Sequence, residues 1–327
     1  MEKYETLVQV AKWYFLDGLG QAEIAKKIKK SRSMVSKMIT EARSKNIVDI
    51  RINYPMSRNR DLEIDLANHL GLTEAWVVDA TGTEELNSLM VAGAAAQCLA
   101  RKLHLGMTLG MAWSRTLREV VQQFEPAYHL GVTVVQLSGS AALGEASLDG
   151  TELVRTLAEK LGGSHRYFPA PLVVRSKELA DALIHEPMVQ QSLNYAQKCD
   201  VAVLGVGTAD LQENSLLQSK LLDKHTLQEL MNKGAVGDIL AHQLRSDGSL
   251  VDTDFNARVI GLTVEALKAI PQVLAVASGY KKIVPIYAAA AGGYFTTLVT
   301  DSSTARGLLQ MQRLPDRDAT TTEGVLA

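Results

Sequence analysis

The segment QAEIAKKIKKSRSMVSKMITEAR, residues 21–43, decides how the N-terminal part of this chain folds. Its small and aliphatic residues recur at the spacing that two short helices need in order to cross at a steep angle. Ala25 is the small residue of the first helix, and Val35, Met38 and Ile39 give the second helix an apolar face at i, i+3 and i+4. Ser31 stands where its hydroxyl oxygen can cap the second helix. We therefore predict a helix-turn-helix.

The predicted second helix exposes polar and basic side chains near its N-terminus. In a helix-turn-helix that binds DNA, this region contacts base edges in the major groove. An amphipathic helix pair of another function could show the same spacing, and Lys29 occupies the turn position where glycine is usual. An apolar helix before the motif and a short strand over residues 47–52 after it complete a winged-helix layout, which favours DNA binding. The residues expected to contact DNA are Gln21, Ser31, Arg32, Ser33, Ser36, Lys37 and Thr40.

Charge divides the chain into two parts. Residues 1–60 contain 13 Lys and Arg against 6 Asp and Glu, a net charge of +7. Residues 61–327 contain 21 against 30, a net charge of −9. Attraction to phosphates therefore belongs to the first part, and the sign of the second part argues that it does not bind nucleic acid itself.

Composition limits the classes of protein that the chain can represent. A length of 327 residues with 46% apolar residues suits one small and one large domain. Cys98 and Cys199 are too few and too far apart to indicate a metal site or a disulfide framework. No signal sequence is visible, and no apolar run approaches the roughly 20 residues that span a bilayer. We expect a cytoplasmic protein without metal, cofactor or membrane contact.

Beyond residue 60, short apolar runs alternate with amphipathic stretches. Strands that are apolar on both faces, with helices between them, predict an α/β fold with a doubly wound parallel sheet. We expect strands at residues 75–78, 107–111, 132–137, 201–205, 273–277 and 296–300, and helices at residues 61–70, 86–100, 117–124, 151–161, 179–184 and 264–270. The domains predicted are a winged helix-turn-helix at 1–54, a linker at 55–60, an effector and oligomerisation domain at 61–312, and a disordered tail at 313–327.

Polar residues follow several of the predicted strands. Ligands of open parallel sheets bind at the carboxyl ends of the strands, where these residues would gather. Helix N-termini and cations there suit an anion, glycines allow close approach of a ligand, and a carboxylate suits paired hydroxyls. The candidate effector-binding residues are Ser114, Arg115, Thr116, Gly139, Ser140, Gly207, Asp238 and Lys282. The mixture favours a polyol or a phosphorylated sugar. A nicotinamide cofactor is excluded because Asp210 stands where a dinucleotide fingerprint needs its third glycine.

Several segments resemble the SorC family of bacterial sugar-responsive transcription regulators. They are the head at residues 11–52, GMTLGMAWSRTL at 106–117, GVGT at 205–208, GAVGDI at 234–239, IGLTVEAL at 260–267 and AAAAGGYFTTLVTD at 288–301. The resemblance covers about residues 5–312. Two positions depart from the family pattern, because Ser114 replaces the glycine common in its loop and Lys29 replaces the turn glycine.

The resemblance implies a fold, an assembly and a binding site. It implies a winged helix-turn-helix joined to an effector domain similar to the sugar-phosphate isomerase and glucosamine-phosphate deaminase fold. A homodimer or homotetramer would bind a double-stranded DNA operator. The loop at 114–116, together with Gly139, Gly207, Asp238 and Lys282, would line the sugar pocket.

Two classes of function compete with a regulator of a carbohydrate or polyol utilisation operon. The first is an isomerase- or deaminase-like enzyme that carries a DNA-binding head, since a fold does not fix a function. Isomerisation needs a positioned general base and acid, and Asp238 is the only carboxylate that we nominate. The second, a protein-interaction module, leaves the polar strand ends unexplained. We therefore expect a regulator whose operator binding is switched by a sugar or sugar phosphate, and not an enzyme.

Overall fold

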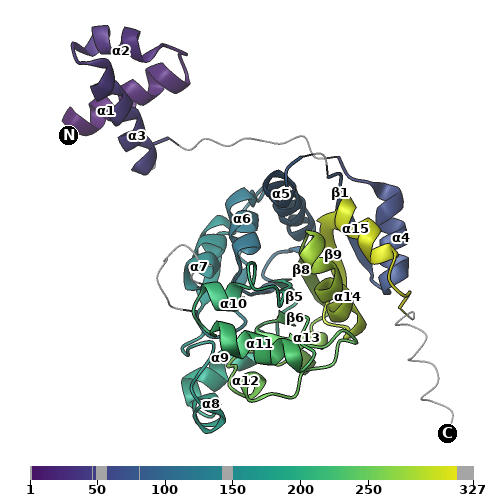
Figure 1. Cartoon of the computed structure of the whole chain (residues 1–327). Helices are drawn as coiled ribbons and strands as arrows, with labels where there is room; N and C mark the ends of the chain where they lie inside the picture. The colour runs from purple at the N-terminus through teal and green to yellow at the C-terminus, as the bar shows by residue number, and fades with distance from the viewer. Residues whose placement is uncertain (1, 46, 49–56, 81, 142–149, 315–327) are drawn as a thin grey trace, which may run out of the picture. The chain divides into compact units, whose positions relative to one another are not determined.

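The computed structural model describes the chain except for residues 1, 46, 49–56, 81, 142–149 and 315–327 (Figure 1). It divides into two compact units, Met1–Pro55 and Met56–Ala327. None of the helices described is long and apolar enough to cross a bilayer.

Unit 1 contains three helices, α1 (Glu2–Phe15), α2 (Gln21–Ile28) and α3 (Arg32–Ser44). Its core is formed by Val10, Ile24, Ala25, Val35 and Ile39, so the predicted apolar faces do pack together. Trp13 lies at the edge of this core. The predicted wing strand falls largely on residues 49–52, which lie outside the described part of the chain.

The turn between α2 and α3 has the geometry that the sequence requires. Lys29 adopts the left-handed conformation with φ of 53° and ψ of 46°, although it is not a glycine. The Lys30 amide donates to the Ala25 carbonyl at 3.0 Å and ends α2. Ser31 caps α3, because its Oγ accepts from the Met34 amide at 3.2 Å.

Unit 2 is built on a parallel sheet of seven strands in the order β1-β9-β8-β5-β2-β3-β4. The strands are β1 (Glu74–Val78), β2 (Thr108–Met111), β3 (Thr133–Gln136), β4 (Ser164–Arg166), β5 (Val201–Gly205), β8 (Gln272–Val276) and β9 (Thr297–Asp301). A separate antiparallel hairpin joins β6 (Gly237–Ile239) and β7 (His242–Leu244). The six predicted strands are confirmed, whereas β4, β6 and β7 were not predicted.

Helices cover both faces of this sheet (Figure 1). They are α4 (Arg60–Leu70), α5 (Glu84–Lys102), α6 (Arg115–Gln123), α7 (Gly150–Lys160), α8 (Lys177–Ile184), α9 (Pro187–Gln197), α10 (Ser215–Gln218), α11 (Lys224–Asn232), α12 (Asp254–Ala257), α13 (Val264–Lys268), α14 (Ile283–Ala291) and α15 (Ser302–Leu309), with the 3-10 helix η2 (Tyr280–Lys282). The chain moves in one direction across the sheet from β2 to β4, and in the other from β5 through β8 to β9. Because parallel crossovers are right-handed, these two directions place their helices on opposite faces.

The sheet therefore has a topological switch point between β2 and β5. These two strands are neighbours, but the connections that leave them run to opposite sides of the sheet. The rule for open α/β sheets places a ligand in the crevice at the carboxyl ends of such strands. The loops that begin at Ala112 and Val206 meet there.

Residues 57–59, which we call the neck, belong to unit 2 and are not part of a free linker. Arg58 pairs with Val78 in an antiparallel bridge, and the Asn59 side chain caps α4. Arg58 also donates to the buried carboxylate of Glu63 at 2.6 and 2.9 Å and stacks on Trp76 at 3.3 Å from the ring centroid. Of the predicted tail, residues 313 and 314 are described, and the Leu314 amide donates to the His69 carbonyl. The rest of that tail, residues 315–327, lies outside the described chain.

Candidate effector pocket and DNA-binding helix

A cavity of about 410 Å³ lies at the switch point of unit 2. Its walls come from the loops after β2, β5 and β8, from the N-termini of α5 and α6, and from the hairpin of β6 and β7. Six of the eight predicted effector-binding residues line it, namely Ser114, Arg115, Thr116, Gly207, Asp238 and Lys282. Its volume is within the range of small-molecule sites.

The N-terminus of α6 forms one wall. Ser114 has the extended backbone of an N-cap, and its Oγ accepts from the Leu117 amide at 3.0 Å. This bond uses one of the free N–H groups of the first turn and leaves the amides of Arg115 and Thr116 at the cavity. The exposed Arg115 guanidinium and the Thr116 hydroxyl add donors for an oxygen-rich ligand.

Asp238 is the buried charge of the pocket. Its Oδ2 accepts from the Ala241 amide at 3.3 Å, whereas Oδ1 has no hydrogen-bond partner among the described residues. Burial raises the pKa of the Asp238 carboxyl to about 6, against the opposing effects of Lys282 and the Ala241 amide. A buried carboxylate oxygen without a partner is costly, and a ligand hydroxyl would satisfy it.

Two local features hold Asp238 in this position. A Cβ on Gly207 would lie 1.8 Å from Asp238 Oδ1, so the glycine leaves the space that the carboxylate fills. The turn at Leu240 and Ala241 has φ of 50° and 69°, a left-handed conformation that is strained in residues with a Cβ. This turn directs the Ala241 amide at the carboxylate.

Lys282 lies beside Asp238 and supplies a cation. Its Nζ donates to the Val206 carbonyl at 2.6 Å, which ties the loop after β8 to the loop after β5. Burial lowers the pKa of the Lys282 ammonium, and the charge of Asp238 acts in the opposite direction. The pocket thus presents an acceptor and a donor to a ligand that carries several hydroxyl groups.

Gly139 and Ser140, although predicted to bind the effector, do not line this cavity. The Ser140 hydroxyl is bonded within the fold, to Gln136 Nε2 at 3.2 Å and Thr151 Oγ1 at 3.3 Å. A Cβ on Gly139 would lie 2.4 Å from the Pro171 carbonyl oxygen, so the glycine serves close packing of two backbone segments. Ser138, which precedes them in the same loop, does line the cavity.

Replacing Gly139 with Ala should therefore damage the fold and not only ligand binding. The added methyl group would overlap backbone atoms of Ala170 and Pro171, which cannot move as a flexible side chain does. We expect a loss of about 1–3 kcal/mol in the free energy of unfolding, measured by urea titration. Unchanged stability would contradict this account of Gly139.

Several pocket residues were not predicted as site residues. Glu84, Glu85 and Ser88 line the pocket from the first turns of α5, and Ser278 lines it after β8. Ser278 follows a predicted strand end, so the rule used for Ser114 could have found it. Glu84 and Glu85 do not follow a strand end, so nothing in the sequence indicated that they line the pocket. They reach it because of the way α5 packs over the sheet.

His242, on β7, is buried without a partner for Nε2 in the described chain. Burial lowers the pKa of His242 to about 4, so the imidazole is neutral at physiological pH. Among the described residues, no three His, Cys, Asp or Glu side chains are grouped as metal ligands would be.

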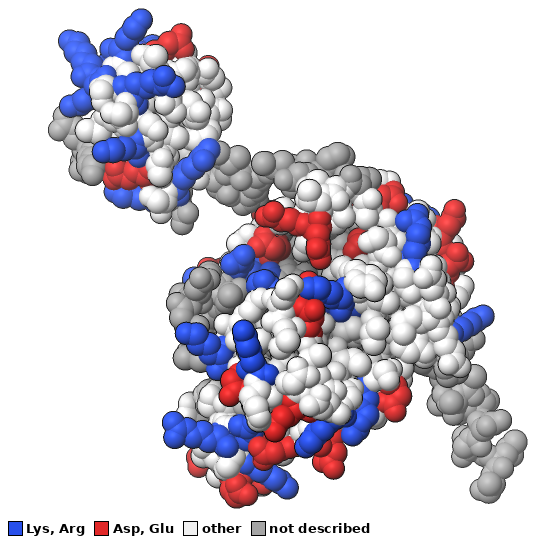
Figure 2. Space-filling model, in the orientation of Figure 1, with Lys and Arg blue, Asp and Glu red and all other residues white. Residues whose placement is uncertain are grey.

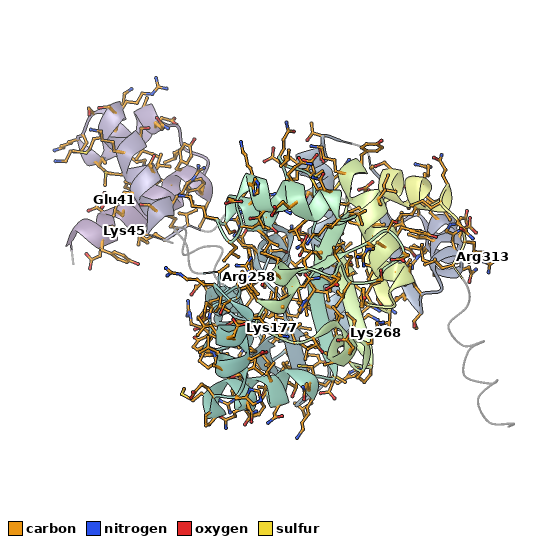
Figure 3. The ribbon with its side chains drawn as sticks, turned by 60° about the horizontal axis from the view of Figure 1, so that its bottom comes forward. Glu41, Lys45, Lys177, Arg258, Lys268 and Arg313 are labelled. Carbon is orange, nitrogen blue, oxygen red and sulfur yellow. The ribbon has the colours of Figure 1, made fainter. Side chains whose placement is uncertain are left out.

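In unit 1, the predicted DNA-contacting side chains of α3 lie on its solvent face. Arg32, Ser33, Ser36, Lys37 and Thr40 are exposed. Ser31 is exposed but engaged in capping, and Gln21, at the start of α2, is half-buried. Lys and Arg side chains are prominent on the face of unit 1 seen in Figure 2. At the other end of α3, Lys45 forms an ion pair with Glu41 at 2.9 Å (Figure 3).

Comparisons with known proteins find relatives that cover most of this chain. The family described as "Putative sugar-binding domain" matches residues 54–310. The transcriptional regulator LsrR of Klebsiella pneumoniae is 30% identical over 315 residues, which cover 94% of this chain and 93% of the relative. The deoxyribonucleoside regulator of Bacillus subtilis is 27% identical over 314 residues, or 94% and 98% of the two chains.

Solved structures show the same fold. The full-length sorbitol operon regulator SorC from Klebsiella pneumoniae superposes with a TM-score of 0.72 at 24% identity, covering 95% of this chain and all of that one. A DeoR family transcriptional regulator from Listeria monocytogenes gives a TM-score of 0.70 at 27% identity, over 76% of this chain and 98% of that one.

Proposed function

This chain belongs to the SorC family of sugar-binding transcriptional regulators, and we propose that the cavity at the β2–β5 switch point is its effector site. The observation that carries the proposal is Asp238 Oδ1, a buried carboxylate oxygen that lacks a hydrogen-bond partner among the described residues and lies at the cavity. A polyol or sugar would donate hydroxyl groups to Asp238. Its oxygens would accept from Lys282, Arg115 and the first turn of α6. A phosphate ester of such a sugar fits the same donors.

We further propose that α3 of unit 1 reads the operator. Arg32 and Lys37 are exposed on the first two turns of α3, where a recognition helix meets base edges. A homodimer or homotetramer in the cytoplasm would place two such helices in successive major grooves of a palindromic operator. Effector binding would favour one arrangement of subunits, and a coupling of about 1–3 kcal/mol would change operator affinity about 5- to 150-fold.

A thermal-shift screen of the purified chain tests the effector site. The probes are D-sorbitol, xylitol, 2-deoxy-D-ribose and D-glucosamine, each with and without a phosphate ester. A bound probe at 100 times its dissociation constant stabilises the protein by about 2.7 kcal/mol. Probes that bind should then change operator binding in a gel-shift titration. They should also be recovered chemically unchanged after incubation with the protein. Turnover of a probe would favour the enzyme alternative.

Effector affinity should depend on pH because of Asp238. The folded carboxyl has a pKa of about 6, above its ordinary value of 3.8, so it takes up a proton as the pH falls through 6. Protonation removes the charge that binds the ligand hydroxyls. Affinity should be constant from pH 7 to 8 and fall by up to about tenfold per unit below pH 6. Calorimetric titration at several pH values measures this, and an equal pH dependence in Asp238→Asn would assign it to another group.

A further inference from the structure

The loop that carries Lys282 is tied to the start of α15 by a hydrogen bond. Gly279 follows Ser278 of the pocket wall, and its amide donates to Thr304 Oγ1 at 2.8 Å. The Thr304 hydroxyl in turn donates to Asp301 Oδ2 at 2.8 Å. Any movement of this part of the pocket wall is therefore resisted by the first turn of α15.

The same turn of α15 is tied to the neck. Ser302 Oγ accepts from the Ala80 amide at 2.9 Å, and the adjacent Asp79 amide donates to the Ser57 carbonyl at 3.0 Å. The Asn59 amide donates to the Val77 carbonyl at 2.8 Å. The neck is the part of unit 2 that precedes α4, and the chain enters it from unit 1. Hydrogen bonds thus lead from the pocket wall to the neck, which contains the first described residues of unit 2.

An ordinary helix cap does not explain this arrangement. Capping accounts for the bonds from the Ser303 and Thr304 amides to Asp301 Oδ1. It does not require Thr304 to bind the loop after β8, or Ser302 to bind the loop after β1. Asp301, Ser302 and Thr304 are each at most 3% exposed, so a broken bond here would leave a buried polar group unsatisfied.

We propose that Asp301, Ser302 and Thr304, the α15 cap cluster, relay occupancy of the pocket to the neck. The proposal rests on the proposed function of the cavity as the effector site. A ligand that binds Lys282 competes with the Val206 carbonyl for its Nζ and so shifts the loop at residues 278–282. The α15 cap cluster passes this shift to Ala80, and Asp79 passes it to the neck. The three residues position other groups and do not touch the ligand.

The matched pair Thr304→Val and Thr300→Val tests the relay in the full chain. Both substitutions replace a hydroxyl with a methyl group at a fully buried position of the same strand–helix unit. Thr304 holds Gly279, whereas Thr300 Oγ1 has no partner among the described residues. Peptide-resolved hydrogen exchange is followed over the segments that contain Asn59, Asp79 and Ala80. In Thr304→Val their amides should exchange about three- to tenfold faster, and in Thr300→Val at the wild-type rate.

Two results would overturn the relay. One is wild-type exchange of Asp79 and Ala80 in Thr304→Val, and the other is equal acceleration in both variants, which would indicate a general loss of packing. If Thr304→Val does not fold, Ser302→Ala replaces it, because this change frees the Ala80 amide and should accelerate exchange at Gly279 on the pocket side. Unchanged exchange at Gly279 would then refute the relay. The experiment needs no ligand, so its failure is distinct from a failure of the sugar screen.

Discussion

Replacing Asp238 with Asn is expected to weaken effector binding by about 10- to 150-fold and so to abolish the response of the operator complex to the effector. The side chain keeps its shape but loses the charge, and each hydrogen bond to a charged group contributes about 1.5–3 kcal/mol. The Lys282 ammonium also loses its neighbouring anion. Operator binding without effector should stay at the wild-type level, measured by gel shift beside a calorimetric titration of the effector.

Stability distinguishes this loss from simple misfolding. The pKa of the Asp238 carboxyl is higher in the folded chain than its ordinary value of 3.8, so the ionised group destabilises the fold above about pH 6 and not below pH 3.8. Asp238→Asn should therefore unfold at the same or a higher urea concentration at pH 7. Asp247→Asn, on an exposed turn of the same unit, is the control and should bind the effector normally. Normal effector binding by Asp238→Asn would remove Asp238 from the site.

Replacing Arg32 with Ala is expected to weaken binding to the specific operator by about 5- to 150-fold. A side chain that makes a bidentate contact to a base contributes about 1–3 kcal/mol to recognition. The operator can be selected from random duplexes with the full chain, and affinities compared by gel shift at fixed salt. Lys37→Ala should also weaken specific binding.

The control for the recognition helix lies on the same helix. Lys45, at the C-cap of α3, forms an ion pair with Glu41 and lies more than three turns from Arg32. Lys45→Ala should reduce binding to specific and random duplexes to a similar, small extent. If Arg32→Ala and Lys37→Ala together leave specific binding intact, α3 is not the recognition helix.

The long apolar strands could be predicted from the sequence because both their faces are buried. Val201, Ala202, Val203 and Leu204 of β5 are all fully buried, and the sequence shows this as an uninterrupted apolar run. Strand β4 has only three residues, two of them exposed, and carries no apolar pattern. The hairpin of β6 and β7 was hidden for a different reason, since its turn uses Leu240 and Ala241 in place of the usual glycine or asparagine.

Only part of the site could be predicted from the sequence. The reason is that the strand-end rule locates an edge of the sheet and does not locate the cavity at that edge. Ser114 and Gly207 follow β2 and β5, the two strands at the switch point, and both reach the pocket. Gly139 and Ser140 follow β3, one strand further along the sheet, where the backbone near Pro171 covers them. Strand order decides between these cases, and strand order is a long-range property that local patterns do not encode.

The three tryptophans of the chain lie in three different regions, so tryptophan fluorescence can report on each region separately. Trp13 borders the core of unit 1, Trp76 stacks on Arg58 of the neck, and Trp113 lines the pocket. Variants that retain a single tryptophan would report by intrinsic fluorescence, with no added dye. Trp13 would report on unit 1, Trp76 on the neck, and Trp113 on the pocket. The order in which the three signals change after rapid mixing with an effector would give the order in which the three regions respond.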